Sequence, residues 1–195
     1  MVFQSVTHGT VELDSVISII KDFLEDEPDA EYSLVIGTDS HEKNGAEPKA
    51  SSPASKADRR GSDGHLKASN GHNGFKNGHS KKLSLVTAVL IHRKGFGGKY
   101  FWVKREASNI HTLREKIYAE TFASLNFATT FVPLLKKSLN GKSPNYNLEI
   151  HVDVGEHGDT RDMIKEVVGM VTGNGFVAKT KPEAYGASYV ADKHT

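Results

Sequence analysis

Two aspartates lie in strongly apolar surroundings, where acidic side chains are seldom found. Asp39 ends the apolar segment 32–39, and Asp153 is embedded in the His-Val-Asp-Val segment 151–154. Acidic residues are depleted in strands, and a buried carboxylate usually needs a charged partner or a metal ion. One such aspartate alone is more often a hydrogen-bonded structural group. Two of them in one sheet favour a shared divalent cation, because the ion removes the repulsion between the carboxylates.

Glu120 is the third candidate, and its place on a helix distinguishes it from Glu115. A long helical pattern begins at Thr112. Glu115 completes a Ser/Thr-x-x-Glu capping box with Thr112, which explains its charge. Glu120 lies beside Ser124 on the apolar face, where nothing local explains a charge, so we predict that it is a metal ligand. A buried pair with Lys or Arg is the alternative. The apolar face is formed by Leu113, Ile117, Ala128, Phe131 and Leu135.

Asp192 is the fourth candidate ligand. It lies near the end of the sequence on a predicted helix that also carries Tyr185 and Ser188 on the same face. A carboxylate near the C-terminal end of a helix is disfavoured by the helix dipole, so it needs a cation nearby. That cation is either a metal ion or the side chain of Lys193 or His194. For His194 itself, a proton shuttle and a frayed terminus are both open interpretations.

The periodicity of the apolar residues predicts the elements that must position these acids. Three strands joined by hairpins and followed by alternating helices and strands indicate an α/β domain with a mixed five-stranded sheet and helices on both faces. Each acid then comes from a different element. The predicted elements are, in order, a helix whose N-cap is Asp14, strands 32–39, 83–92 and 99–105, a helix 112–139, a strand 145–154, a helix capped by Asp159, a strand 176–181 and a C-terminal helix with Pro182 at its first position.

Residues 41–82 form a low-complexity segment in the first hairpin. The segment is rich in Gly, Ser, Asn, Lys and His, and Leu66 and Phe75 are its only large apolar side chains. It cannot bury enough apolar surface to fold, so we predict a disordered insertion. A long loop at this place costs little, because closure entropy grows slowly with length. A solvated insertion without a task is favoured over a basic arm that contacts phosphates. Residues 1–195 are otherwise predicted to form a single domain.

Composition excludes several classes of protein. The formal net charge is +1, so no global charge draws the chain to nucleic acid or to an anionic membrane. There is no cysteine, which excludes disulfides, thiolate zinc sites and a cysteine nucleophile, and any metal site must use oxygen or imidazole ligands. The N-terminal residues do not have the pattern of a signal peptide, and no run of about 18 apolar residues could span a bilayer. We therefore expect a cytoplasmic protein without membrane contact.

Five short motifs are spread over the chain outside the insertion. They are Ile36-Gly-Thr-Asp-Ser40, Leu113-Arg-Glu-Lys-Ile117 with Glu120-Thr121, His151-Val-Asp-Val-Gly155, Val167-Val-Gly-Met-Val171 and the ending Ala187-Ser-Tyr-Val-Ala-Asp-Lys-His-Thr195. Together they resemble the YkuK-like family of predicted ribonuclease H-like bacterial proteins. The resemblance covers essentially the whole chain except the insertion, since members usually have a much shorter first hairpin. It implies a ribonuclease H-like fold.

The resemblance also implies a metal-dependent nuclease, because ribonuclease H, the integrases and the junction resolvases hold two magnesium or manganese ions with acids on these elements. By that resemblance Asp39 would bridge two ions about 4 Å apart, and Glu120 and Asp153 would lie on either side of the bridge. Asp192 would complete the second site. Such ions support in-line hydrolysis of a phosphodiester bond, and the partner would be a nucleic acid of open type. Oxygen ligands favour Mg²⁺ or Mn²⁺ over zinc.

Several neighbours of these acids are candidates for supporting roles. Thr38 and Ser40 are candidate hydrogen-bond donors to the ligands. Arg114, Lys116 and Arg161 could contact phosphates, but each is equally a solvated helix residue or the partner of a carboxylate. Tyr100, Phe101 and Trp102 alternate on a predicted strand, so at least one of these aromatic side chains faces outward; packing against a helix is favoured over stacking on a base.

Two other functions are compatible with parts of this pattern. A nucleic-acid-binding or protein-interaction module could keep the fold without turnover, although the presence of all four acids argues against it. The Gly37-Thr38-Asp39 sequence resembles the first phosphate loop of the actin-like ATPases. Those enzymes need two such domains and a second glycine-rich loop, which this chain is too short to supply.

Overall fold

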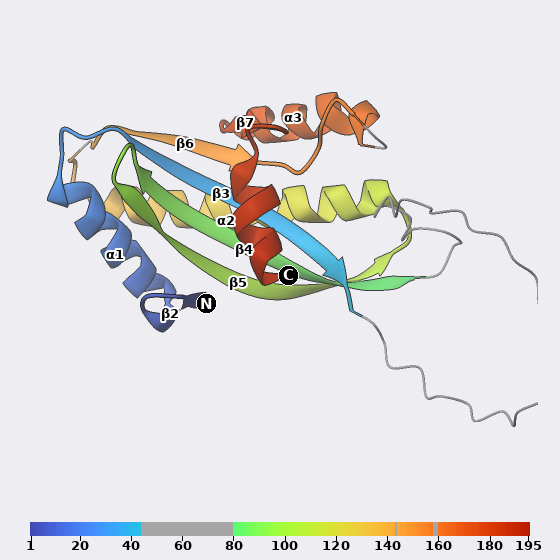
Figure 1. Ribbon diagram of the computed structural model, residues 1–195, viewed down its shortest axis with the longest axis horizontal. Coiled ribbons are helices and arrows are strands. Elements are labelled where there is room, and N and C mark those ends of the chain that lie inside the picture. Colours follow the sequence, from blue (N-terminus) through green and yellow to red (C-terminus); the bar gives the residue numbers. More distant parts are fainter. Residues whose placement is uncertain (44–79, 143, 158–159) are drawn as a thin grey trace, which may run out of the picture.

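The chain folds around one mixed β-sheet (Figure 1). The computed structural model describes residues 1–43, 80–142, 144–157 and 160–195, and seven strands within these ranges form the sheet in the order β2-β1-β5-β4-β3-β6-β7. The strands are β1 Val2–Ser5, β2 Gly9–Glu12, β3 Tyr32–Glu42, β4 Lys81–Arg93, β5 Gly97–Ile110, β6 Tyr146–His151 and β7 Val177–Lys179. The helices are α1 Leu13–Asp26, α2 Leu113–Ser138 and α3 Ile164–Gly173, with shorter helical segments η1 Arg161–Met163, η2 Gly186–Ala191 and η3 Asp192–His194.

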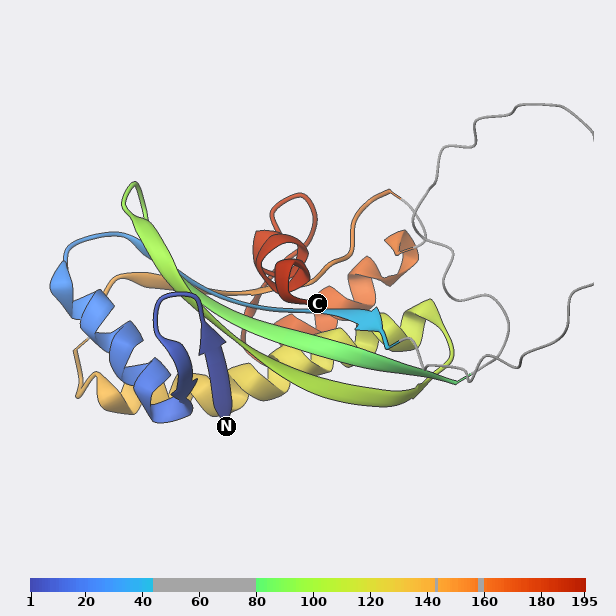
Figure 2. The same ribbon diagram turned by 60° about the horizontal axis from the view of Figure 1, so that its bottom comes forward.

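The central strands have the predicted connections. The long strands β3, β4 and β5 form an antiparallel meander, and β6 and β7 continue the sheet in parallel beside β3. The α/β class, the mixed sheet and the position of helices on both faces are as predicted (Figures 1 and 2). No helix in the described ranges has both the length and the apolarity needed to cross a bilayer.

The sheet has seven strands and not the predicted five, because residues 2–12 form a hairpin that the sequence pattern did not indicate. Strands β1 and β2 pair antiparallel, and Gln4 of β1 is opposite Trp102 of β5. The strands are short and mostly exposed, so their apolar periodicity is weak. Tertiary packing stabilises them instead: Phe3 is fully buried, and its ring centroid lies 5.6 Å from that of Phe127.

The ends of three predicted elements also differ from the prediction. Helix α1 begins at Leu13, so Asp14 lies in its first turn and is not the N-cap, which is Glu12 without a side-chain cap hydrogen bond. The Leu13 N–H donates to the carbonyl of Met1 at 3.1 Å. Pro182 does not open the C-terminal helix. It lies in a turn in which Lys181 N–H donates to the Val154 carbonyl at 2.8 Å. Strand β6 ends at His151.

Two sequence-based predictions concern residues that the structure describes only in part or not at all. Strand β3 extends to Glu42 and β4 begins at Lys81, so both ends of the segment 41–82 belong to strands. Residues 44–79, the bulk of the predicted insertion, lie outside the described residues. Asp159, the predicted cap of α3, also lies outside them.

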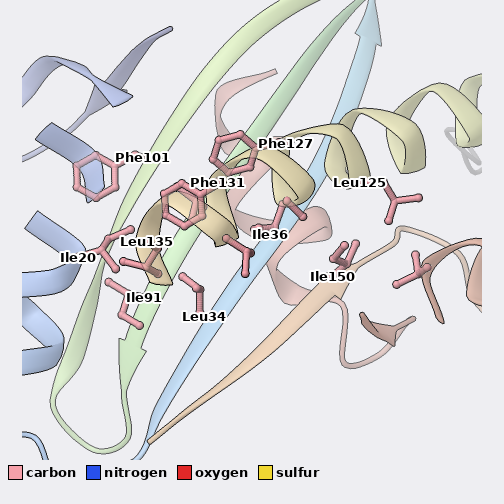
Figure 3. Packing of buried hydrophobic residues seen from close by; sticks show 14 of the residues in the cluster. Ile20, Leu34, Ile36, Ile91, Phe101, Leu125, Phe127, Phe131, Leu135 and Ile150 are labelled. Atoms are coloured by element: carbon pink, nitrogen blue, oxygen red, sulfur yellow. The ribbon is translucent and has the colours of Figure 1, made fainter. Parts of the chain in front are cut away.

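The main core lies between the sheet and the helices α1, α2 and α3. Figure 3 shows how α2 lays aromatic and aliphatic side chains over the apolar residues of the central strands. On β3 the side chains alternate, so Leu34 and Ile36 enter this core while Val35 faces the other side. The labelled core residues are Ile20, Leu34, Ile36, Ile91, Phe101, Leu125, Phe127, Phe131, Leu135 and Ile150.

The opposite face of the sheet carries the C-terminal segment η2–η3, which Figure 2 shows on the other side of the sheet from α2. A small cluster joins this segment to the strands: Ala191 packs on Val86 and Ala88, with Trp102 and Val190 at its edge. The two faces of the sheet are thus covered very unequally.

Candidate functional site

Asp39 lies near the end of β3 on the sheet face that the C-terminal segment covers. The alternation of β3 places it on the same side as Val35, and it is 9% exposed. The pKa of Asp39 is raised to about 6: burial has the largest effect, Lys116 lowers the pKa, and the negative charges of Asp153 and Asp192 contribute to the rise. Both of these aspartates are therefore close enough to Asp39 for their charges to act on it.

Glu120 is buried on α2, where only 2% of it is exposed, and reaches the same strand from the core face. Its Oε1 atom accepts a hydrogen bond from the Ser40 hydroxyl at 2.7 Å. Within the described part of the chain, its buried Oε2 atom has no hydrogen-bond partner. Burial raises the pKa of Glu120 to about 7; Lys116 lowers it and Asp39 raises it. The charge of Asp39 thus disfavours ionisation of Glu120.

Lys116 is the cation between these two acids. Its Nζ atom lies 2.8 Å from Oε1 of Glu120 and 3.8 Å from Oδ1 of Asp39. Burial opposes the charge on Lys116, but Glu120, Asp39 and Asp153 together hold the pKa of the ammonium above its usual value. Of the two interpretations of Glu120, the pair with a basic side chain is present, and the i, i+4 spacing on one helix accounts for it.

Asp153 lies just beyond the carboxyl end of β6, not inside a strand as the sequence pattern indicated. Its Oδ1 atom is 2.9 Å from Nζ of Lys181, which follows β7. About a quarter of the Asp153 side chain, 24%, is exposed. The position fits the rule that ligand-binding residues gather where parallel strands end.

Asp192 begins η3 and is exposed beside this group. It is the most exposed of the four acids, and its negative charge raises the pKa of Asp39. The structure therefore brings together acids from β3, α2, the loop after β6 and the C-terminal segment. Among the described residues, however, no group of three or more His, Asp or Glu side chains is arranged closely enough to hold a metal ion.

The donor set still fits a hard divalent cation in its chemistry. All four candidates are carboxylates, and the unpartnered Oε2 of Glu120 is a buried oxygen with capacity to accept another partner. Lys116 now supplies positive charge between Glu120 and Asp39. Direct binding of an ion by these two acids would require the Lys116 side chain to move.

The two hydroxyl side chains predicted to support the acids have different partners. Ser40 contacts Glu120 as expected of a supporting donor. Thr38 instead accepts a hydrogen bond from Ser124 of α2 at 2.8 Å and shares another with Thr87 of β4 at 2.9 Å. Thr38 therefore joins α2 to the sheet.

Sequence reasoning missed two residues at the edge of the site. Lys181 is distant in sequence from Asp153, and no local pattern indicates their contact. His151 is 1% exposed, and its Nδ1 atom accepts a hydrogen bond from the Gly186 N–H at 2.9 Å. Burial lowers the pKa of His151, and Nδ1 must be unprotonated to accept this bond. His151 thereby fastens the start of η2 to the sheet.

A cavity of about 510 Å³ opens next to Asp153. It lies between the loops that follow β6 and β7, and Lys181 belongs both to its wall and to the pair with Asp153. Its volume is in the usual range of small-ligand pockets. The lining residues are Gly155, Glu156, His157, Thr180, Lys181, Pro182 and Glu183.

Comparisons with known proteins agree with this architecture. The family model described as "Ribonuclease H-like" matches residues 76–195. A relative from Bacillus subtilis (strain 168), described as "Uncharacterized protein YkuK", is 26% identical over 204 residues, which cover 99% of this chain and 96% of the relative. No solved structure matches the chain. The family match spans the meander from β4 onward, α2 and the elements that carry Glu120, Asp153 and Asp192, so this chain belongs to the ribonuclease H-like family.

Proposed function

We propose that this protein is a divalent-metal-dependent nuclease that hydrolyses phosphodiester bonds of a nucleic acid. Two findings support the proposal: membership of the ribonuclease H-like family and the gathering of Asp39, Glu120, Asp153 and Asp192 around one end of β3. The acids come from elements far apart in the sequence. A cluster of like charges is costly unless a cation compensates it.

The main observation behind the proposal is that Lys116 only partly neutralises the buried carboxylate of Glu120. A purely structural ion pair normally satisfies both oxygens of a buried carboxylate. Here Oε2 lacks a partner among the described residues, and the pKa remains raised to about 7 although Lys116 is 2.8 Å from Oε1. One ammonium group thus does not offset the burial of Glu120 and the charge of Asp39. A further cation at this place would.

In this proposal Asp39 is the central ligand, because it responds to the charges of Asp153 and Asp192 and shares Lys116 with Glu120. When bound, a pair of Mg²⁺ or Mn²⁺ ions supplies the activation of the attacking water and the stabilisation of the leaving oxygen. Ser40 orients Glu120 through its 2.7 Å hydrogen bond. Lys116 lessens the repulsion between the acids while no ion is bound.

The proposal is tested by cleavage of labelled RNA, DNA, hybrid and junction substrates with Mn²⁺. Asp39→Asn and Asp153→Asn should each lower cleavage by on the order of 100-fold or more, since a loss of a few kcal/mol in transition-state stabilisation has that effect. Asp22→Asn, which removes an exposed carboxylate on α1, is the matched control and should cleave like the parent. Equal cleavage by Asp153→Asn and the parent would remove this aspartate from the mechanism.

A non-catalytic binding module is the second candidate, and the pairs Lys116–Glu120 and Lys181–Asp153 favour it. In that case the lysines permanently neutralise two of the acids. Calorimetric titration with Mg²⁺ separates the two functions. A nuclease should give a binding heat that Asp39→Asn abolishes and that Lys116→Met preserves or enhances. If Asp39→Asn leaves the heat unchanged, the proposed metal site is wrong.

A further inference from the structure

His194, the second-last residue, lies flat against Trp102 of β5 and is not part of a frayed terminus. The two ring centroids are 3.6 Å apart, and the ring planes differ by 5°. Tyr100, on the same side of β5, stacks on Trp102 at 5.7 Å, and its hydroxyl is 3.3 Å from Nε2 of His194. Three aromatic side chains therefore fix the last turn of the chain to the sheet.

Two other anchors hold the earlier part of the C-terminal segment. The Gly186 N–H donates to His151, and a Cβ atom at position 186 would lie only 2.4 Å from Cγ1 of Val35. Ala191 is fully buried against β4. The segment thus crosses the sheet from β6 and β3, over β4, to β5, and each strand contributes one point of attachment.

The pairing of β3, β4 and β5 locates the stack of Tyr100, Trp102 and His194 relative to Asp39. Val86 of β4 lies opposite both Asp39 of β3 and Lys104 of β5, and Trp102 is the next residue on this face of β5. Two strand spacings, about 10 Å, separate β3 from β5. Asp192 lies between the buried Ala191 and the stacked His194, so the attachment on either side determines where its carboxylate lies.

We propose that the stack of His194 on Trp102 and Tyr100 is the positioning device that holds Asp192 beside Asp39. These three aromatic residues are then positioning residues of the acidic site, and the proposal rests on the proposed function for the role of Asp192 as a ligand. Helices as short as η2 and η3 are not stable by themselves, so contacts with the sheet must fix them. Asp192 itself is exposed and contributes little to this attachment.

The first test measures the attachment without metal. Hydrogen exchange of residues 184–195 should become faster in His194→Ala and in Trp102→Leu, whereas His194→Phe and Trp102→Phe should restore protection because they keep an aromatic pair. Trp102 is the only tryptophan of the chain, so its fluorescence reports the stack directly and should change in His194→Ala. Phe96→Ala, which removes a 77% exposed aromatic at the β4–β5 hairpin, is the matched control. Unchanged exchange in both His194→Ala and Trp102→Leu would overturn the inference.

The second test measures Mg²⁺ affinity by calorimetry with the same variants. His194→Ala should bind Mg²⁺ about fivefold more weakly, the factor that corresponds to an aromatic pair of about 1 kcal/mol, and His194→Phe should bind within about twofold of the parent. Faster exchange with unchanged affinity would show that the stack does not position a ligand. Absence of Mg²⁺ binding by the parent would refute the proposed function and the ligand role of Asp192 with it, while the exchange data would still decide whether the stack attaches the segment.

Discussion

The two faces of the sheet are built on different principles. On one face, helices α1, α2 and α3 bury a continuous apolar core that includes Phe131 and Leu135. On the other face, a short C-terminal segment rests on a few contacts, among them Ala191 on Val86 and the stack at Trp102. The first face contains most of the buried apolar side chains. The second carries Asp192, whose position the proposed stack would determine.

The acidic site lies where the two faces meet. Glu120 belongs to the core face, where only 2% of it is exposed, whereas Asp39 and Asp192 belong to the sparsely covered face. Lys116 connects the two sides because it reaches both Glu120 and Asp39. One half of the site is therefore enclosed by the packing of α2 on the sheet, and the other half lies under the short C-terminal segment.

The largest expected effect comes from truncating a buried side chain on the core face. Phe131→Ala should lower the free energy of unfolding by about 3–5 kcal/mol, since the residue is fully buried among aromatic and aliphatic neighbours. Val86→Ala, fully buried on the other face, should cost only about 2 kcal/mol, because it removes two methylene equivalents at about 0.8 kcal/mol each. Urea unfolding measures both. A loss well below about 3 kcal/mol for Phe131→Ala would contradict the close packing of this residue in the core.

A smaller effect is expected from pH, at the junction of the two faces. Burial raises the pKa of Asp39 from 3.8 to about 6 and that of Glu120 from 4.5 to about 7 in the folded protein. The folded state therefore binds more protons than the unfolded state between these values. The stabilisation that protonated Asp39 and Glu120 give to the folded state is fully present below their unfolded pKa values. It is lost as the pH rises through about 6 for Asp39 and about 7 for Glu120.

Without metal, the free energy of unfolding should thus fall between pH 4 and pH 8 by on the order of 2 kcal/mol for each carboxyl. Glu120→Gln should remove the part of this pH dependence that comes from Glu120, because the amide does not titrate. Denaturant unfolding at a series of pH values tests the expectation. A Glu120→Gln profile parallel to that of the parent would exclude a raised pKa at Glu120.

The smallest effect on global stability, about 1–3 kcal/mol, is expected from Gly186→Ala, which overpacks the attachment of the C-terminal segment. The new Cβ would meet Cγ1 of Val35 at 2.4 Å and Nδ1 of His151 at 3.2 Å. Residues 186–195 should therefore lose protection in hydrogen exchange more than α2 does. Gly169→Ala on α3, where nothing lies within 4 Å of the added Cβ, is the matched control and should be neutral or stabilising. Equal loss of protection in both variants would argue against a separately attached segment.

Much of the fold was predictable because it depends on local patterns. The capping box of Thr112 and Glu115 is present at the start of α2, as predicted. The apolar runs predicted β3, β4 and β5 in the correct order. The N-terminal hairpin was missed, because its short strands depend on pairing with β5 and on the burial of Phe3.

By itself the sequence determined the central strands, their order and the choice of candidate acids, because apolar periodicity and capping act between near neighbours. The contact of Lys116 with Glu120 also follows from their i, i+4 spacing on one helix. Only the tertiary structure decided which cation Asp153 contacts and how the C-terminal segment is attached. Lys181 meets Asp153, and His194 lies on Trp102, although both pairs are distant in sequence. Such contacts depend on how whole elements pack against each other, and no local pattern along the chain encodes them.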